Sequence, residues 1–236
     1  MTAGHHLVHG ERVAMPVRVR DAALAAAMFA VPAAPVQALI AYSGLEAARP
    51  WRGKAVCSLV CVRYADGDLG PYHEFGVAFL VRHPDGRRGT GVFVHWLPVN
   101  QEFTLEAGRS IWGFPKELAD IPLHLAGRTK RCAVRFGGRT AIELAVRSGL
   151  PVPVPSGRAV PDLDAYSCLE GTTRRISWTV EASGVRVRPG GARVRLGDHP
   201  VAEELREIGL GHARALSTTT VARASMVFGE AEEVRP

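Results

Sequence analysis

Residues 54–99 read KAVCSLVCVRYADGDLGPYHEFGVAFLVRHPDGRRGTGVFVHWLPV, and this stretch decides the fold class. Three apolar runs, at 54–64, 73–83 and 89–99, are rich in Val, Phe, Leu and Cys, and the turn-forming stretches DGDLGP and PDGRRG separate them. Short apolar runs between clusters of Gly, Pro and Asp are typical of β-strands joined by turns. The stretch therefore predicts three consecutive strands.

The rest of the chain continues this pattern with a few helices inserted. Further strands are expected at 130–136, 140–147, 174–180 and 215–228, and helices at 33–42, 101–109 and 199–210. Many short strands with few helices favour a mainly β (α+β) protein built as an antiparallel barrel or sandwich. No linker or internal repeat divides the chain, so residues 1–236 are expected to form a single domain.

Composition and charge are those of an ordinary globular protein. The chain has 236 residues, of which 47% are hydrophobic and 22% charged, with a formal net charge of +6. The basic excess is spread along the sequence, so we expect no nucleic-acid partner.

The first 17 residues are polar and contain His5, His6 and His9. We expect them to form a flexible N-terminus rather than a metal site.

The segment VRVRPGGARVRL, residues 185–196, alternates valine and arginine around Pro-Gly-Gly, which is typical of a β-hairpin. Period-two alternation would place its arginines together on the solvated face, with phosphate binding as the alternative. These arginines are Arg186, Arg188, Arg193 and Arg195.

The longest apolar run, AALAAAMFAVPAAPV at 22–36, is interrupted by Pro32 and Pro35. It is shorter than the ~20 residues of a membrane span, so we interpret it as folded core. A cytoplasmic protein with no membrane partner is the resulting expectation.

Four cysteines, Cys57, Cys61, Cys132 and Cys168, have neither zinc-site spacing nor the density of a disulfide scaffold. They are expected to be buried thiols, and no metal site is predicted. No GxGxxG follows a strand, and P-loop, HExxH and GxSxG motifs are absent. We therefore expect no cofactor.

Residues 111–121, IWGFPKELADI, place a single lysine, Lys116, directly after Trp112, Phe114 and Pro115. Burial disfavours the ammonium form, so an apolar pocket converts lysine into a nucleophile that forms an imine with a ketone. The alternative is a loop lysine whose stem covers apolar residues while its amine stays in water.

The segment AGRSIWGFPKELADI, residues 107–121, resembles the active-site segment of the acetoacetate decarboxylase superfamily, with Gly-Arg followed by Gly-Phe/Tyr-Pro-Lys. Three further segments resemble the family in the same order and extend the similarity over most of residues 50–230. They are DGDLGPYHEFGVAFLV (66–81), VHWLPVNQEFTLEAGR (94–109) and HPVAEELREIGL (199–210).

This resemblance implies a cone-like antiparallel β-barrel with a few peripheral helices, assembled as a homo-oligomer. It also implies that Lys116 is the Schiff-base lysine and Glu74 the catalytic glutamate beside it. Tyr72 lies two residues before Glu74, so in a strand both side chains share a face and can enter one pocket. An exposed strand carboxylate is the alternative for Glu74.

Three more residues complete the predicted substrate site. Trp112 and Phe114 are expected to line the pocket. Arg109 matches the family's arginine before the lysine motif, with structural anchoring and substrate-carboxylate binding both open.

Two departures from the family pattern concern the substrate. Glu117 stands where acetoacetate decarboxylases have a second lysine, and Ala22 to Tyr42 contains no arginine for the pocket. Neighbours in an extended segment point to opposite sides, so we expect Glu117 to point away from Lys116.

The predicted function is that of a lysine Schiff-base lyase acting on a small keto acid. Decarboxylation of a β-keto acid comes first, and aldolase-dehydratase or retro-aldolase chemistry on pyruvate-like substrates is the alternative. A pocket that binds a small molecule or shapes its cyclisation without catalysis is the third possibility.

Overall fold

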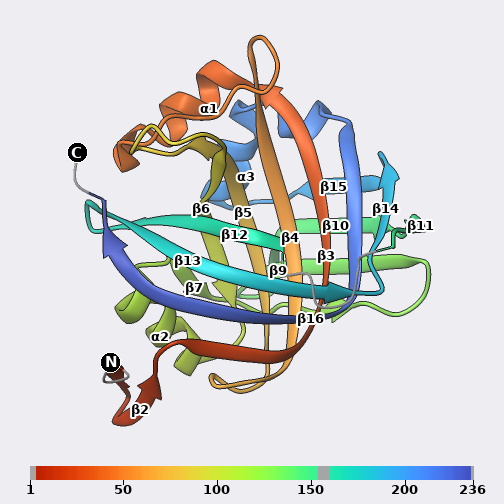
Figure 1. The fold of residues 1–236 in the computed structure, drawn as a ribbon. Helices are drawn as coiled ribbons and strands as arrows, with labels where there is room; N and C mark the ends of the chain where they lie inside the picture. The colour runs from red at the N-terminus through yellow and green to blue at the C-terminus, as the bar shows by residue number, and fades with distance from the viewer. Residues whose placement is uncertain (1–3, 154–159, 235–236) are drawn as a thin grey trace.

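Seven strands close into a barrel in the computed structural model, which describes residues 4–153 and 160–234 (Figure 1). Adjacent strands are antiparallel, apart from the parallel pair of β6 and β12, and the pairing of β16 with β3 closes the ring. This arrangement confirms the predicted mainly β barrel. The strands are β3 (Val17–Pro32), β4 (Lys54–Gly67), β5 (Tyr72–Arg82), β6 (Thr90–Val99), β12 (Val160–Leu169), β13 (Thr172–Ser183) and β16 (Ala215–Glu233).

Strand β5 is apolar along nearly its whole length because both of its faces are buried. Phe75, Val77 and Phe79 pack in a core cluster outside the barrel. Glu74 and Gly76 alternate with them and line a cavity inside the barrel. Successive side chains of a strand point to opposite faces, so one run of sequence builds both the core and the cavity wall.

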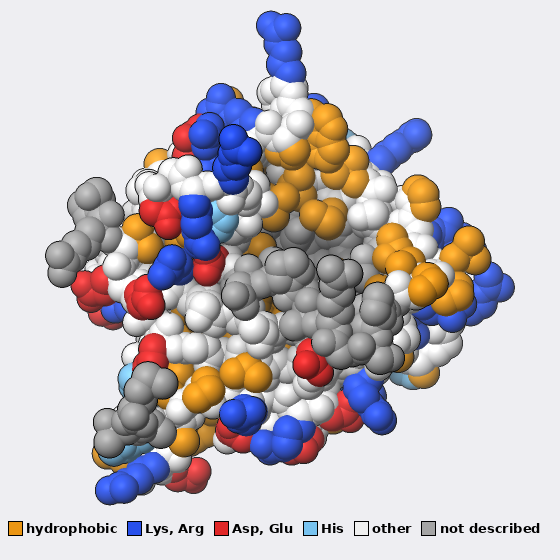
Figure 2. Space-filling view, viewed as in Figure 1, with side chains coloured by type: hydrophobic (Ala, Val, Ile, Leu, Met, Phe, Trp, Pro, Cys, Tyr) orange, Lys and Arg blue, Asp and Glu red, His pale blue; other side chains and the backbone are white. Residues whose placement is uncertain are grey.

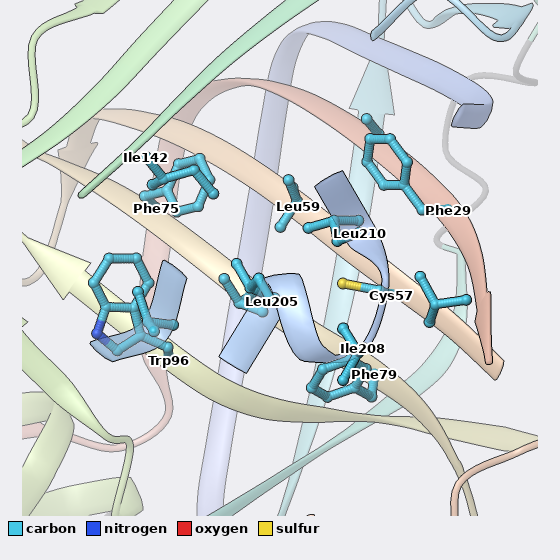
Figure 3. Packing of buried hydrophobic residues seen from close by; sticks show 14 of the residues in the cluster. Phe29, Cys57, Leu59, Phe75, Phe79, Trp96, Ile142, Leu205, Ile208 and Leu210 are labelled. Atoms are coloured by element: carbon cyan, nitrogen blue, oxygen red, sulfur yellow. The ribbon is translucent and has the colours of Figure 1, made fainter. Parts of the chain in front are cut away.

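The outer core is covered by an additional layer of helices and strands. A four-stranded sheet contains β8 (Leu123–His124), β9 (Thr129–Phe136), β10 (Arg139–Arg147) and β15 (Ala192–Leu196). The helical elements are α1 (Ala33–Leu39), η1 (Ala41–Ser43), α3 (Pro200–Glu207) and η2 (Leu210–His212). In Figure 3, Leu205, Ile208 and Leu210 face the barrel residues Leu59 and Phe79.

One further helix and three short strands adjoin the barrel. Helix α2 (Glu102–Trp112) leads into the short strand β7 (Lys116–Leu118), and β11 (Leu150–Pro151) pairs with β14 (Arg186–Pro189). In the view of Figure 1, α2 and α1 lie at opposite ends of the barrel.

The N-terminal segment differs from the expected flexible stretch. Strands β1 (His5–Val8) and β2 (Glu11–Ala14) form a hairpin. Val8, Val13 and Met15 are buried in the same core cluster as residues of α2. The polar composition concealed these few apolar residues, which are sufficient to hold the segment against the barrel.

The predicted hairpin over 185–196 is wrong. Strand β14 pairs with β16, whereas β15 pairs with β10 in the other sheet. Gly190 and Gly191, both with positive φ, carry the chain from one sheet to the other. Arg186, Arg193 and Arg195 are exposed as expected, and Arg188 is half-buried.

The cysteines and the surface charges agree with the expectations from composition. All four cysteines are buried and free of disulfides. Basic side chains are interspersed with acidic ones on the face shown in Figure 2. No helix in residues 4–153 and 160–234 combines the length and apolar character that a membrane crossing requires.

Leu205 tests the contribution of the outer layer. It is fully buried where α3 packs against the barrel, so Leu205→Ala should lower the free energy of unfolding by about 2–5 kcal/mol. Leu150→Ala removes the same atoms from a side chain that is 78% exposed and should change stability by less than about 0.5 kcal/mol. Urea denaturation measures both values, and equal losses would contradict the described packing.

Candidate active site

A cavity of about 160 Å³ lies inside the barrel and is mainly apolar. Its walls come from all seven barrel strands, together with the turn between β4 and β5 and residues around the C-terminal end of α2. Among the described residues that line it, only Glu74 and Lys116 carry a charge. The interior of the barrel therefore holds one acid and one base in hydrocarbon surroundings.

The end of α2 determines where Lys116 enters the cavity. Gly113 caps the helix in the left-handed conformation, with φ of 64°, and Phe114 N donates to Gly108 O at 3.0 Å. A residue with a side chain is strained at such a φ, which explains the glycine. The chain then reverses through Pro115 into β7, where Lys116 pairs with Leu97 of β6.

Gly108 provides space for the lysine stem. A Cβ atom on Gly108 would lie 2.5 Å from Lys116 Cδ and 3.1 Å from Lys116 Nζ. The stem therefore lies directly against the helix backbone, and any side chain at this position would displace the amine. This contact gives a physical reason for the glycine of the Gly-Arg pair.

Two hydrogen bonds attach the same segment to the barrel. Trp112 Nε1 donates to Gly229 O of β16 at 2.8 Å, and the Ser167 hydroxyl of β12 donates to Trp112 O at 2.6 Å. The residue at the end of the helix is thus bonded to two strands that are far away in sequence. These bonds restrict the position of the backbone that carries Lys116.

Lys116 and Glu74 form a buried ion pair. Lys116 Nζ donates to Glu74 Oε2 at 2.9 Å, and the two residues are only 4% and 7% exposed. Burying two charges costs several kcal/mol for each ion, and their contact offsets that cost only with good geometry. Moving the proton from nitrogen to oxygen would leave a neutral amine and a neutral acid, the forms that an apolar cavity favours.

Tyr64 holds the carboxylate from its other side, and Tyr72 stacks on Tyr64. The Tyr64 hydroxyl donates to Glu74 Oε1 at 2.9 Å, and the rings of Tyr64 and Tyr72 are stacked with centroids 4.2 Å apart. Lys116 Nζ lies 5.3 Å from the Tyr72 ring centroid, within cation–π range. Burial, and then the nearby Glu74 carboxylate, raise the pKa of both phenols well above the ordinary value. Both tyrosines therefore stay protonated and can donate hydrogen bonds at neutral pH.

Most of the predicted site residues meet in this cavity. Lys116, Glu74, Tyr72, Trp112 and Phe114 all line it, as the spacing of Tyr72 and Glu74 in one strand predicted. The structure thus excludes the exposed alternatives for Lys116 and Glu74.

Two charged residues of the motif lie outside the cavity. Arg109 is exposed on α2 and does not line the cavity, so the described chain gives it no contact with the interior. The reason is helical geometry, because Gly108 occupies the position on α2 that faces the lysine. The Glu117 side chain is 48% exposed, and its Oε2 lies 3.9 Å from His199 Nε2, which confirms that it points away from Lys116.

Sequence reasoning missed three residues of the site. Tyr64 ends the first apolar run of the opening stretch, and its pairing with Tyr72 across β4 and β5 brings it to Glu74. Trp178 and Phe228 come from β13 and β16 and stack on each other in the cavity wall. Alternate residues of β4 share a face, so the strand pattern could have placed Tyr64 in the cavity wall. Trp178 and Phe228 reach the cavity only because distant strands pair and close the barrel.

The fold and the site define a class: a closed β-barrel with a lysine–carboxylate pair buried in an apolar interior. Comparison with known families identifies it further, since the acetoacetate decarboxylase family model matches residues 8–232. The chain belongs to the acetoacetate decarboxylase family. No curated protein sequence matches the chain significantly.

Three solved structures illustrate the structural similarity. Acetoacetate decarboxylase from Legionella pneumophila is 17% identical with a TM-score of 0.69, over 93% of this chain and 87% of that one. An acetoacetate decarboxylase-like enzyme from Sphingomonas wittichii RW1 is 18% identical with a TM-score of 0.66, over 99% and 100%. The enduracididine biosynthesis enzyme MppR, complexed with the condensation product of pyruvate and imidazole 4-carboxaldehyde, is 14% identical with a TM-score of 0.70, over 95% and 92%. At these identities the likeness concerns the fold.

The raised pKa values of Tyr64 and Tyr72 predict that these two tyrosines ionise at higher pH in the folded protein than in the unfolded chain. Unfolded tyrosine ionises near pH 10, so the unfolded chain releases these protons first as the pH rises. The stability that they contribute is therefore complete below about pH 10 and decreases above it. Absorbance at 295 nm should show at least two fewer tyrosines ionising near pH 10 in the folded protein than in guanidinium chloride.

Tyr64→Phe is the control for this titration. It should leave the folded amplitude near pH 10 unchanged and reduce the unfolded amplitude. A reduced folded amplitude near pH 10 in this variant would show that Tyr64 ionises normally and would contradict the described environment.

Proposed function

We propose that the protein is an imine-forming carbon–carbon lyase that acts on a keto acid, with Lys116 as nucleophile and Glu74 as proton carrier. The buried Lys116–Glu74 pair in an apolar cavity is the observation on which the proposal rests. Membership of the acetoacetate decarboxylase family supports the same chemistry.

Imine formation begins with proton transfer from Lys116 Nζ to Glu74 Oε2 across their 2.9 Å hydrogen bond. The free amine attacks the ketone carbon and gives a carbinolamine. Glu74 then returns its proton to the carbinolamine oxygen, which leaves as water as the protonated imine forms. Tyr64 holds the other carboxylate oxygen and fixes the orientation of Glu74 throughout.

Decarboxylation is the reaction that we place first. In the imine of a β-keto acid, the bond between the α carbon and the carboxylate breaks, and its electron pair moves toward the iminium nitrogen. Carbon dioxide leaves and an enamine remains. The α carbon then takes up one proton that comes from water and is passed on through Glu74 or a tyrosine hydroxyl, and a water molecule hydrolyses the imine to release the ketone and restore Lys116.

Aldolase-dehydratase chemistry is the second candidate. The same enamine can attack an aldehyde, after which loss of water requires a group that moves protons. Glu74 with Tyr64 and Tyr72 forms such an array. The MppR complex with a condensation product of pyruvate and an aldehyde is a precedent on a similar fold.

Covalent trapping tests the proposal. Borohydride in the presence of acetylacetone, acetoacetate or pyruvate should attach the expected mass to the peptide that contains Lys116. Lys54 and Lys130, the other two lysines of the chain, serve as internal controls and should stay unmodified. Folded protein that gives no adduct with any of these compounds would favour a binding pocket without catalysis.

Glu74→Gln separates imine formation from turnover in the same experiment. The variant should still be trapped, because a buried amine without a counter-ion favours the neutral form that attacks the ketone, but turnover should be about 10²–10⁴-fold slower, because a general acid–base group is gone. Glu117→Gln makes the same chemical change at the exposed neighbouring position and should retain the wild-type rate.

Carbon dioxide release from acetoacetate, compared with product formation from pyruvate and an aldehyde, distinguishes the two reactions.

A further inference from the structure

The cavity contains no free cation among its described lining residues. Its walls hold no Arg and no His, and its single lysine is paired with Glu74. Arg109, the arginine nearest the lysine in sequence, is exposed outside it. A ligand carboxylate that does not react would therefore be buried without a counter-ion.

That absence decides which ligands the cavity accepts. An unpaired carboxylate in an apolar environment is strongly disfavoured, so a substrate with a second, permanent carboxylate is excluded on energetic grounds. Each methylene placed against the same walls improves affinity by roughly fourfold. A cavity of about 150 Å³ with such walls accommodates a benzene molecule, so about 160 Å³ provides room for a chain of several carbons.

One polar group in the wall has no partner. Trp178 stacks on Phe228 with centroids 5.5 Å apart, and its Nε1 is buried with no hydrogen-bond acceptor among the described residues. The other cavity indole, that of Trp112, already donates to Gly229 O. A buried donor without a partner is costly, and a ligand oxygen would satisfy it.

We infer that the substrate is a ketone with a second oxygen at the β position and an apolar substituent of several carbons, and that Trp178 Nε1 donates to that second oxygen. This inference rests on the proposed function. If the protein is a decarboxylase, its substrate is a β-keto acid whose only carboxylate is the one that leaves and whose other end is a hydrocarbon chain. The same argument counts against an aldolase that acts on pyruvate, because the carboxylate of pyruvate does not leave and would be buried without a counter-ion among the described lining residues.

A matched pair of β-diketones tests whether the cavity prefers a ligand with an apolar end to one with a carboxylate there. 2,4-Heptanedione and 4,6-dioxoheptanoic acid share the same diketone, and the terminal methyl of the first is a carboxylate in the second. Calorimetric titration of the double variant Lys116→Met/Glu74→Gln, which cannot form an imine and leaves no unpaired carboxylate in the described cavity, measures selectivity without covalent chemistry. The neutral compound should bind at least about 10²-fold more tightly. Borohydride trapping on the wild-type protein then reports imine formation separately.

The two measurements distinguish the two claims. Equal affinity of the double variant for both diketones, or preference for the acid, would overturn the inference even if Lys116 is trapped in the wild type. Selective binding of the neutral compound without trapping would support the inference about the cavity and overturn the proposed imine chemistry. If neither compound binds and neither is trapped, both claims fail.

Trp178→Phe tests the hydrogen bond while keeping an aromatic ring against Phe228. Affinity for 2,4-heptanedione should fall about three- to tenfold, whereas affinity for 2-heptanone, which lacks the second oxygen, should stay the same. Trp112→Phe is the matched control, because its indole already has an acceptor and its loss should not discriminate between the two ketones. An equal effect of Trp178→Phe on both compounds would show that the indole only fills space.

Discussion

The buried ion pair between Lys116 and Glu74 is the constraint on which the rest of the structure depends. Two charges taken out of water are tolerated only when they contact each other and their remaining hydrogen-bonding capacity is used. Tyr64 satisfies the second carboxylate oxygen, and Tyr72 presents its ring face to the ammonium group. The same surroundings that make this pair costly favour the neutral amine and acid that imine chemistry needs.

The barrel supplies this environment because its strands are buried on both sides. In β5 the outward residues Phe75, Val77 and Phe79 join the core under α3, and the inward ones form the cavity wall. Small inward residues keep the cavity open, since a Cβ on Gly76 would lie 2.9 Å from Val60 Cγ1. The outward residues therefore build the core, and the inner face remains available for chemistry.

Much of the site was predictable from local sequence, whereas the closure of the barrel was not. The shared face of Tyr72 and Glu74 and the opposite orientation of Glu117 are properties of single strands, so they follow from strand parity, whereas Lys116 was identified by its resemblance to the family's motif. Strand β3 was recognised only as apolar core, because alanine is a poor strand former and hid its alternation. The separation of β14 from β15, and the arrival of Trp178 and Phe228 at the cavity, depend on pairings between distant segments.

The most direct test of the ion pair is the NMR signal of the Lys116 side chain at one fixed, neutral pH. The chain contains only Lys54, Lys116 and Lys130, so the Cε signal of Lys116 can be assigned with Lys116→Met. Because Glu74 Oε2 lies 2.9 Å from Lys116 Nζ, Glu74→Gln should shift the Lys116 Cε signal, while the signals of Lys54 and Lys130 should stay in place. A Lys116 signal at the same position in the wild type and in Glu74→Gln would contradict the ion pair on which the proposed chemistry depends.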